Sequence, residues 1–361
     1  MKLTIFSNGV SNGGAERVTC NLANYFVENG YDVDLLTMSD DEPTYYIDEK
    51  VRRIELINKS ERKGFVADFL LRVRRIKRYC TISRTDCYIG IMQTAWICLL
   101  LLRKKIRNPI IITERSDPHN YSSRMQWILT HLLHRADACV FQTEGQFGFY
   151  RKWLGKCKGV KIPNAINVTT EPLDWSKREK KVIAIGRLQK VKNYPMLIRA
   201  FSRAARQNGD YVLEIFGEGK ERETLENIIK ESGMEKRIRL CGFDRNVAEQ
   251  LRTSKIYVLS SDHEGMPNAL IEAMATGVAC ISTDCEAGAP REIINGDNGI
   301  LVPVGDEQAL YEALCSLMKD DRKAEMMAQN AIDIRSRFSR ESVYGMWGGL
   351  VQTLIEENAR A

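Results

Sequence analysis

Short apolar runs alternate with amphipathic segments along the whole chain. The runs that have the composition of buried strands form two series. The first is Leu3–Phe6, Val33–Thr37, Cys87–Ile91, Ile110–Thr113 and Ala138–Gln142, and the second is Val182–Ile185, Val212–Phe216, Ile238–Leu240, Ile256–Leu259 and Val278–Ser282. Helical periodicity between successive runs is typical of parallel, doubly wound sheets. The polar segment TTEPLDWSKREK separates the two series, so we expect an α/β fold with two sheets and a linker.

The length of 361 residues agrees with two domains, because it is large for one hydrophobic core. The N-terminal MKLTIFSNG lacks the apolar stretch of a signal peptide, and the run at roughly Ile89–Leu102 is too short to span a bilayer. The 10 cysteines are scattered without metal-ligand spacing, which is typical of reduced thiols in a cytosol. We therefore expect a cytoplasmic protein, and its 4 histidines argue against a His-rich metal site.

The net charge of +6 is concentrated in the first half of the chain. The segment Lys59–Arg78 is rich in Lys and Arg. Its apolar residues recur at helical spacing, at Phe65, Phe69, Leu70, Val73 and Ile76. Two interpretations stay open: a helix that packs on the core by its apolar face, or a basic amphipathic helix that rests on anionic lipid. No nucleic-acid motif accompanies the charge, so a nucleic-acid partner is not expected.

Two carboxylates follow one strand of the second series. Glu264 lies in the short loop after that strand, and Glu272 lies inside a helix that Pro267 is expected to open and Gly277 to end. Free backbone N–H groups at a helix start attract phosphate. A carboxylate beside bound phosphate is repelled unless it binds something neutral, such as sugar hydroxyls. The combination suggests a nucleotide-sugar site.

Other strand ends carry glycines or cations, and ligands of parallel sheets bind at these ends. Gly13 and Gly14 precede a predicted helix, where they either admit a diphosphate to the backbone or simply make a tight turn. Arg187 and Lys192 follow the first strand of the second series. A guanidinium and an ammonium there can neutralise the charge of a diphosphate leaving group.

Three further features carry less weight. Phe243 and Arg245 follow another strand and could flank a planar base, although plain loop structure explains them equally well. Asn295–Asp306 has the turn residues and the short apolar run of a hairpin-like edge. Asp32 and Asp34 form a D-x-D pattern, but they open a predicted strand, so we expect no metal there.

Several segments together resemble bacterial family 4 retaining glycosyltransferases, in order and spacing, over nearly the whole chain. They are GGAERV (Gly13–Val18), IPNAIN (Ile162–Asn167), GRLQKVKN (Gly186–Asn193), FGEG (Phe216–Gly219), EGMPNALIEAMATG (Glu264–Gly277) and GDNGILVPVGD (Gly296–Asp306). The resemblance implies a GT-B fold, in which two Rossmann-like domains face a cleft. It implies an acceptor-binding domain at 1–168, a nucleotide-sugar-binding domain at 169–340, and a helix in 341–361 that crosses back onto the first domain.

The resemblance also implies roles for single residues. Arg187 and Lys192 match the pair that holds the donor diphosphate. Glu264 matches the glutamate that contacts the sugar ring, and Glu272 matches the one that holds the ribose hydroxyls. Gly14 matches the glycine that approaches the phosphates on closure. The loop whose backbone contacts sugar and phosphate corresponds to Gly265, Met266, Pro267 and Asn268.

One position departs from the pattern of the family. Many relatives have a histidine after the fourth strand of the N-terminal domain, near the reacting sugar. This chain reads IIITERSDPH there, with Glu114 and Arg115 in place and His119 close by. That resembles a subgroup that acts on amino sugars and galactose-type donors, and it leaves open which of the three side chains replaces the histidine.

We therefore expect a retaining, metal-independent and cofactor-free glycosyltransferase that moves a hexose or N-acetylhexosamine from a UDP-sugar to a glycan acceptor. The basic first half fits a lipid-linked acceptor at the inner face of the cell membrane, as in surface polysaccharide biosynthesis. A nucleotide-sugar epimerase on the same fold and a non-catalytic sugar-nucleotide-binding protein are the alternatives. A Rossmann oxidoreductase is not supported, because SNGVSNGGAE does not keep the G-x-G-x-x-G spacing.

Overall fold

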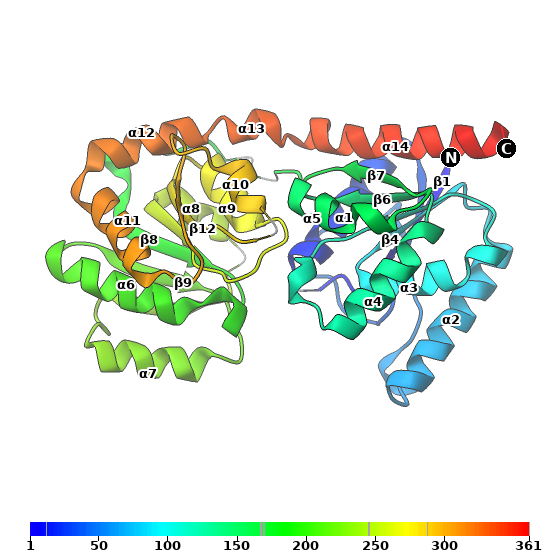
Figure 1. The fold of residues 1–361 in the computed structure, drawn as a ribbon, viewed down its shortest axis with the longest axis horizontal. Helices are drawn as coiled ribbons and strands as arrows, with labels where there is room; N and C mark the ends of the chain where they lie inside the picture. The colour runs from blue at the N-terminus through cyan, green and yellow to red at the C-terminus, as the bar shows by residue number, and fades with distance from the viewer. Residues whose placement is uncertain (12, 167, 169, 245, 287, 361) are drawn as a thin grey trace. The chain divides into compact units, whose positions relative to one another are not determined.

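The computed structural model describes residues 1–11, 13–166, 168, 170–244, 246–286 and 288–360. The chain forms two compact units, one of Met1–Ala165 with Arg340–Ala361 and the other of Ile166–Ser339. Each unit contains one parallel sheet with helices packed on it (Figure 1). The expectation of an α/β protein with two parallel sheets is confirmed.

The sheet of the first unit has the strand order β3-β2-β1-β4-β5-β6-β7. Its strands are β1 (Lys2–Ser7), β2 (Asp32–Thr37), β3 (Arg52–Glu55), β4 (Cys87–Ile91), β5 (Ile110–Thr113), β6 (Ala138–Phe141) and β7 (Lys158–Lys161). Its α-helices are α1 (Gly14–Glu28), α2 (Phe65–Ile82), α3 (Gln93–Leu101), α4 (Ser123–Leu132), α5 (Glu144–Tyr150) and α14 (Arg340–Arg360). Short 3₁₀ turns are η1 (Lys59–Glu61), η2 (Arg103–Lys105), η3 (Pro118–Asn120), η4 (Leu133–Arg135) and η5 (Arg151–Trp153).

The sheet of the second unit has the strand order β10-β9-β8-β11-β12-β13. Its strands are β8 (Glu179–Ile185), β9 (Val212–Phe216), β10 (Ile238–Gly242), β11 (Ser254–Leu259), β12 (Ala279–Thr283) and β13 (Ile300–Val302). Its α-helices are α6 (Tyr194–Gln207), α7 (Arg222–Ser232), α8 (Val247–Thr253), α9 (Asn268–Ala275), α10 (Ala289–Ile293), α11 (Glu307–Lys319), α12 (Asp321–Ala331) and α13 (Ile334–Arg337), and its 3₁₀ turns are η6 (Trp175–Lys177) and η7 (Lys190–Lys192).

Three strands of the structure are absent from the two series predicted from the sequence, and all three lie at sheet edges. The sequences of β3 and β7, RRIE and KGVK, are half exposed and rich in charge, as edge strands commonly are. The hairpin expected at Asn295–Asp306 is wrong, because β13 pairs with β12 in parallel. The turn residues serve the loop before β13, where the amide of Asn298 donates to the carbonyl of Ile293 and its Oδ1 accepts from the N–H of Asn295.

The long apolar run near residue 95 is a strand followed by a helix. Strand β4 is buried throughout, and α3 places Ala95, Trp96 and Leu99 in the core of the first unit. The run that is too short to span a bilayer is therefore a largely buried strand and helix of the first unit. Within the described part of the chain, no helix combines the length and the apolar character needed to cross a membrane.

The last helix, α14, belongs to the first unit, as the fold class implied. It packs against α1 and β4 and is the red helix of Figure 1. Its inward side chains are Val343, Tyr344, Trp347, Leu350, Val351 and Leu354, all buried. Tyr344 packs on Tyr25 of α1 with ring centroids 5.1 Å apart, and Arg340 pairs with Glu28 at 2.6 Å.

Removing the largest of these side chains should destabilise the first unit. We expect Trp347→Ala to lower its free energy of unfolding by about 3–5 kcal/mol, because an indole that is 1% exposed leaves a cavity in a packed core. Met346→Ala is the matched control, since Met346 is 44% exposed on the same helix and should cost less than about 0.5 kcal/mol. Denaturant unfolding of both variants checks this, and equal losses would contradict the packing of α14.

Candidate functional site

The loops that follow β8 and β11 meet through an ion pair. Lys192 Nζ lies 2.6 Å from Glu264 Oε1, and the hydroxyl of Ser261 donates to the same oxygen at 2.7 Å. The side chains of Lys192 and Glu264 are 21% and 15% exposed, so the pair is largely withdrawn from water. The pair is therefore less screened than one on the surface, and it holds a cation and a carboxylate in one fixed place.

Further hydrogen bonds join the same two loops. The hydroxyl of Ser260 donates to the carbonyl of Lys192, and the N–H of Asp262 donates to the carbonyl of Val191, each at 2.8 Å. The amide of Asn193 donates to Asp262 Oδ1, also at 2.8 Å. Asn193 itself adopts the left-handed conformation at φ 46°, which an asparagine tolerates and which turns the chain into α6.

Close backbone approach explains the glycines of GRLQ and FGEG. A Cβ at Gly186 would lie 2.9 Å from Lys192 Cε, and a Cβ at Gly217 would lie 2.0 Å from the carbonyl oxygen of Gly186. The loop after β9 thus rests directly on the loop after β8. Arg187 is exposed beside this contact and, among the described residues, has no ion-pair partner.

The loop–helix unit that contains both glutamates forms close to the predicted bounds. Pro267 is the N-cap of α9 rather than its first residue, and Gly277 follows the helix with φ 69°. Glu272 is half-buried inside the helix. The neighbouring Gly265, Met266 and Asn268 are half-buried in or beside the preceding loop, at the start of the helix.

Strand ends elsewhere hold the remaining residues singled out for the donor. Gly13 is the N-cap of α1 and Gly14 is its first residue, as expected. The carboxylate of Glu16 lies against Gly13, where a Cβ would meet Glu16 Oε2 at 1.9 Å, so the start of α1 already faces a negative charge. Phe243 is 56% exposed after β10, and Arg245 lies outside the described residues.

Glu114 lies at the end of β5 and is almost completely buried, at 1% exposure. Its Oε1 accepts hydrogen bonds from Gln93 Nε2 at 3.0 Å and from the hydroxyl of Tyr121 at 2.9 Å, besides the N–H groups of Arg115 and Ser116. Its Oε2 has no partner among the described residues. Burial raises the pKa of Glu114 to about 7, against the opposing effect of these donors.

The other two residues at this position take different places. Arg115 donates to Thr113 and to Asn164, and burial lowers its pKa to about 10. His119 lies on η3, where its Nδ1 is 2.9 Å from Asp117 Oδ1 and its ring packs on that of Phe149. Of these three residues, only Glu114 is in the buried class, whereas Arg115 is half-buried and His119 is exposed. Gln93 and Tyr121 were not singled out from the sequence, because no motif marks them and they meet Glu114 only through the fold.

The basic segment Lys59–Arg78 buries only part of its apolar residues. Phe69, Val73 and Ile76 of α2 pack on the core. Phe65, Val66 and Leu70, in the first turns of α2, are 86%, 68% and 62% exposed, and we call these three the apolar patch of α2. The apolar residues of this segment lie in a helix, as their spacing predicted, but the core of the first unit covers only some of them.

The D-x-D pattern lies in β2, and Asp34 is engaged by protein groups. Its buried carboxylate pairs with Lys2 at 3.1 Å and with Arg52, and it accepts a hydrogen bond from Tyr79. These donors hold the pKa of Asp34 below its usual range despite burial. Asp34 therefore anchors the edge strand β3 to the sheet through Arg52.

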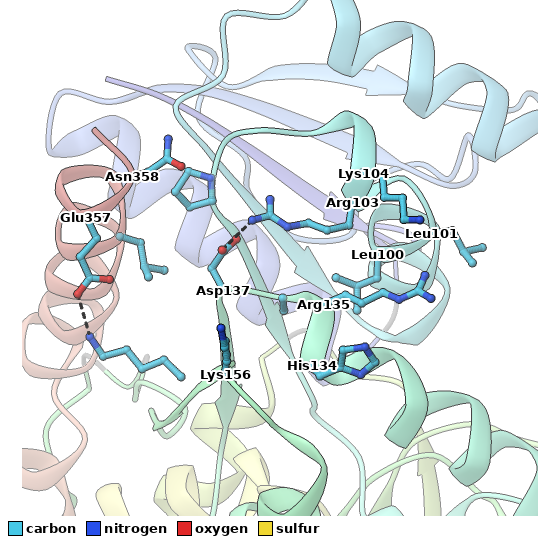
Figure 2. Close-up of a pocket in the computed structure, with 14 residues that line it drawn as sticks. Leu100, Leu101, Arg103, Lys104, His134, Arg135, Asp137, Lys156, Glu357 and Asn358 are labelled. Carbon is cyan, nitrogen blue, oxygen red and sulfur yellow. Dashed lines mark hydrogen bonds and ion pairs between the residues drawn. The ribbon is translucent and has the colours of Figure 1, made fainter. Parts of the chain in front are cut away.

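A cavity of about 1140 Å³ opens at the amino ends of β5, β6 and β7, and none of the expected site residues lines it (Figure 2). Its charged walls are partly paired, Arg103 with Asp137 at 2.8 Å and Lys158 with Glu357 at 3.6 Å. Ligands of parallel sheets bind at the opposite, carboxyl ends of the strands. We therefore place the candidate donor site at the loops after β8 and β11 of the second unit, and we treat the loop after β5 in the first unit separately.

Comparison with known proteins shows the family to which the chain belongs. Residues 12–170 match the family model described as Glycosyltransferase Family 4, and residues 167–333 match the one described as Glycosyl transferases group 1. The N-acetylgalactosamine-N,N'-diacetylbacillosaminyl-diphospho-undecaprenol 4-alpha-N-acetylgalactosaminyltransferase of Campylobacter jejuni is 30% identical over 89% of this chain and 91% of its own length. The chain belongs to glycosyltransferase family 4. The amylovoran biosynthesis glycosyltransferase AmsD of Erwinia amylovora, also similar to this family 4 protein, is 25% identical over 97% and 99% of the two chains.

Solved structures share the fold of this family 4 glycosyltransferase. HepE of Anabaena, in complex with UDP and glucose, superposes with a TM-score of 0.84 over 98% of this chain and 99% of its own, at 18% identity. Sucrose-phosphate synthase of Thermosynechococcus elongatus gives a TM-score of 0.85 over 99% of both chains, at 18% identity. The GT-B fold implied by the sequence motifs is thus confirmed.

The raised pKa of Glu114 predicts a pH dependence of stability. A carboxyl whose pKa rises from 4.5 unfolded to about 7 folded favours the folded state below pH 4.5, and this contribution is lost as the pH rises through 7. Between pH 5 and pH 8 the free energy of unfolding of the native protein should therefore fall by about 2.5 kcal/mol relative to that of Glu114→Gln, whose amide does not titrate. Denaturant unfolding across this range measures the difference, and parallel curves for the two proteins would refute it.

Proposed function

We propose that this protein is a retaining, metal-independent glycosyltransferase that moves a hexose or N-acetylhexosamine from a UDP-sugar to a lipid-linked glycan in surface polysaccharide biosynthesis. The observation that carries the proposal is the Lys192–Glu264 pair at the carboxyl edge of the second sheet, with the exposed Arg187 beside it. The names of relatives support the substrate classes: an undecaprenol-linked acceptor for the Campylobacter jejuni protein, and UDP with glucose for HepE.

The chemistry follows from the charges of these side chains. Arg187 and Lys192 supply positive charge for the diphosphate that leaves, which is the group that a metal ion neutralises in other transferases. Glu264 orients the transferred sugar through its hydroxyls, and Glu272 does the same for the ribose. The departing phosphate oxygen takes the proton of the acceptor hydroxyl on the same face of the sugar, so the anomeric configuration is retained and no protein base is needed.

A glycosidase-like use of the two glutamates is disfavoured by their positions. Paired carboxylates of that type act from opposite faces of a sugar ring. Glu264 and Glu272 belong to one loop and the helix that follows it, and Glu264 already accepts from Lys192 and Ser261. A carboxylate held in this way serves better as a fixed hydrogen-bond acceptor than as an acid or a nucleophile.

Substitution of the ion pair tests the assignment of the site. Lys192→Ala is expected to lower kcat/KM for transfer by about 10²–10³-fold, because one positioned donor to the leaving group is lost. Glu264→Ala should also abolish most of the transfer. Lys190→Ala is the control, since Lys190 is an exposed cation of the same η7 turn. A screen of UDP- and GDP-sugars with release of nucleotide as the readout checks this.

The same screen separates the proposal from its rivals. A transferase releases UDP in proportion to added acceptor, whereas an epimerase converts the donor without acceptor and a binding protein does neither. If Glu264→Ala were as active as Lys190→Ala, the assignment of Glu264 to the site would be wrong.

We further propose that the apolar patch of Phe65, Val66 and Leu70 contacts anionic lipid at the inner face of the cell membrane. Exposed apolar side chains of this size rarely occur together without a partner surface, and the exposed cations Arg74, Lys77 and Arg78 continue along the same helix. The patch would hold the acceptor-binding domain at the surface where a lipid-linked acceptor is found.

Flotation with liposomes tests this contact. Replacing Phe65 and Leu70 together by Ser should lower the partition onto vesicles that contain anionic lipid by at least about tenfold, since two side chains lose their apolar burial. Met326→Ser is the control, because Met326 is also exposed, at 56%, but lies in the second unit. Equal flotation of all three proteins, or indifference to anionic lipid, would exclude the contact.

A further inference from the structure

Two buried tyrosines lie beside the Lys192–Glu264 pair without an assigned role. Tyr194 is the first residue of α6 and is 3% exposed, and Tyr257 lies in β11 and is completely buried. Neither phenol oxygen has a hydrogen-bond partner among the described residues. Burying an unpaired hydroxyl opposes folding, so a pair of them at one place calls for an explanation.

The position of the Tyr194 hydroxyl is defined by Gly186. A Cβ at Gly186 would lie 2.9 Å from Tyr194 Oη and 3.3 Å from Lys192 Nζ, so the hydroxyl and the ammonium lie side by side against the same backbone. Burial raises the pKa of Tyr194, and the negative charge of Glu264 raises it further. The phenol is therefore protonated at neutral pH and is close enough to the carboxylate to respond to its charge.

The pKa of Tyr257 is also raised, first by burial and then by Tyr194, Glu264 and other neighbouring groups. In the described part of the chain, the bonds that Glu264 accepts from Lys192 and from Ser261 both end on Oε1. The second oxygen of the carboxylate can accept another donor, and Tyr194 is a neutral one with its hydrogen unused.

Binding of a diphosphate at Lys192 would change the balance of charge around Glu264. The ammonium of Lys192 would then be shared between the carboxylate and a more highly charged anion. The negative charge of Glu264 would therefore be offset by less positive charge than before. A carboxylate in a mostly buried place needs a replacement donor, or it moves or takes up a proton.

We propose that Tyr194 is a positioning residue whose hydroxyl donates to Glu264 when a diphosphate draws on the charge of Lys192. The proposal rests on the proposed function, in which Lys192 binds the donor diphosphate and Glu264 the sugar. It explains why a hydroxyl is kept where it opposes folding: its partner becomes available only with the nucleotide bound.

Isosteric removal of one oxygen gives a direct test by calorimetric titration. Tyr194→Phe is expected to weaken UDP binding about tenfold, the effect of one hydrogen bond to a charged group, and to leave UMP binding unchanged because UMP lacks the second phosphate. Its Tm should not fall, since Phe removes a buried unpaired hydroxyl and keeps the ring. Tyr211→Phe is the control, because Tyr211 is also buried in the second unit but lies before β9, at the amino edge of the sheet.

A double-mutant cycle isolates the coupling to Lys192. In a Lys192→Ala background Glu264 has no ammonium to lose, so Tyr194→Phe should weaken UDP binding no further. Unchanged UDP affinity of Tyr194→Phe, equal losses for UDP and UMP, or full additivity with Lys192→Ala would each overturn the role of Tyr194. A lack of effect of Lys192→Ala alone would instead contradict the proposed function, so the two failures are distinguishable.

Discussion

The adjacency of β8 and β11 in the second sheet is the constraint on which the candidate site depends. Parallel neighbours end at the same edge, so the loops that follow them meet although Lys192 and Glu264 are 72 residues apart in sequence. The ion pair between them is then backed by bonds from Ser260 and Asp262 to the backbone of the other loop. The charges are thus fixed by the order of the strands and not by local sequence.

Much of this arrangement could be predicted from sequence, and the exceptions share a physical cause. The buried strands read as apolar runs, and Pro267 and Gly277 marked the bounds of α9 to within a residue. Strands β3 and β7 were missed because edge strands need no apolar run, and the short apolar run of β13 gives no sign that its partner in the sheet is the parallel β12. Contacts between distant segments were also hidden: no motif shows that Lys192 bonds to Glu264, or that Tyr194 Oη and Lys192 Nζ both lie against Gly186.

Glu264 and Glu114 lie in different surroundings. In the second unit Glu264 is paired with Lys192 and remains 15% exposed, so it can exchange partners with a ligand. In the first unit Glu114 is closed off from solvent and half of its carboxylate is without a partner, so burial outweighs its donors. The sequence showed both glutamates at strand ends, but the difference in their surroundings comes from Gln93 and Tyr121, which other elements supply.

The return of α14 to the first unit makes that unit discontinuous along the chain, with the second unit inserted between residues 165 and 340. During synthesis the first sheet emerges early, but the surface that Trp347 and Leu350 cover stays open until the whole second unit has been made. The second unit is continuous and can complete its core before the first one does. Vectorial synthesis therefore favours a reversed order of completion, in which the domain that begins the chain is the last to close.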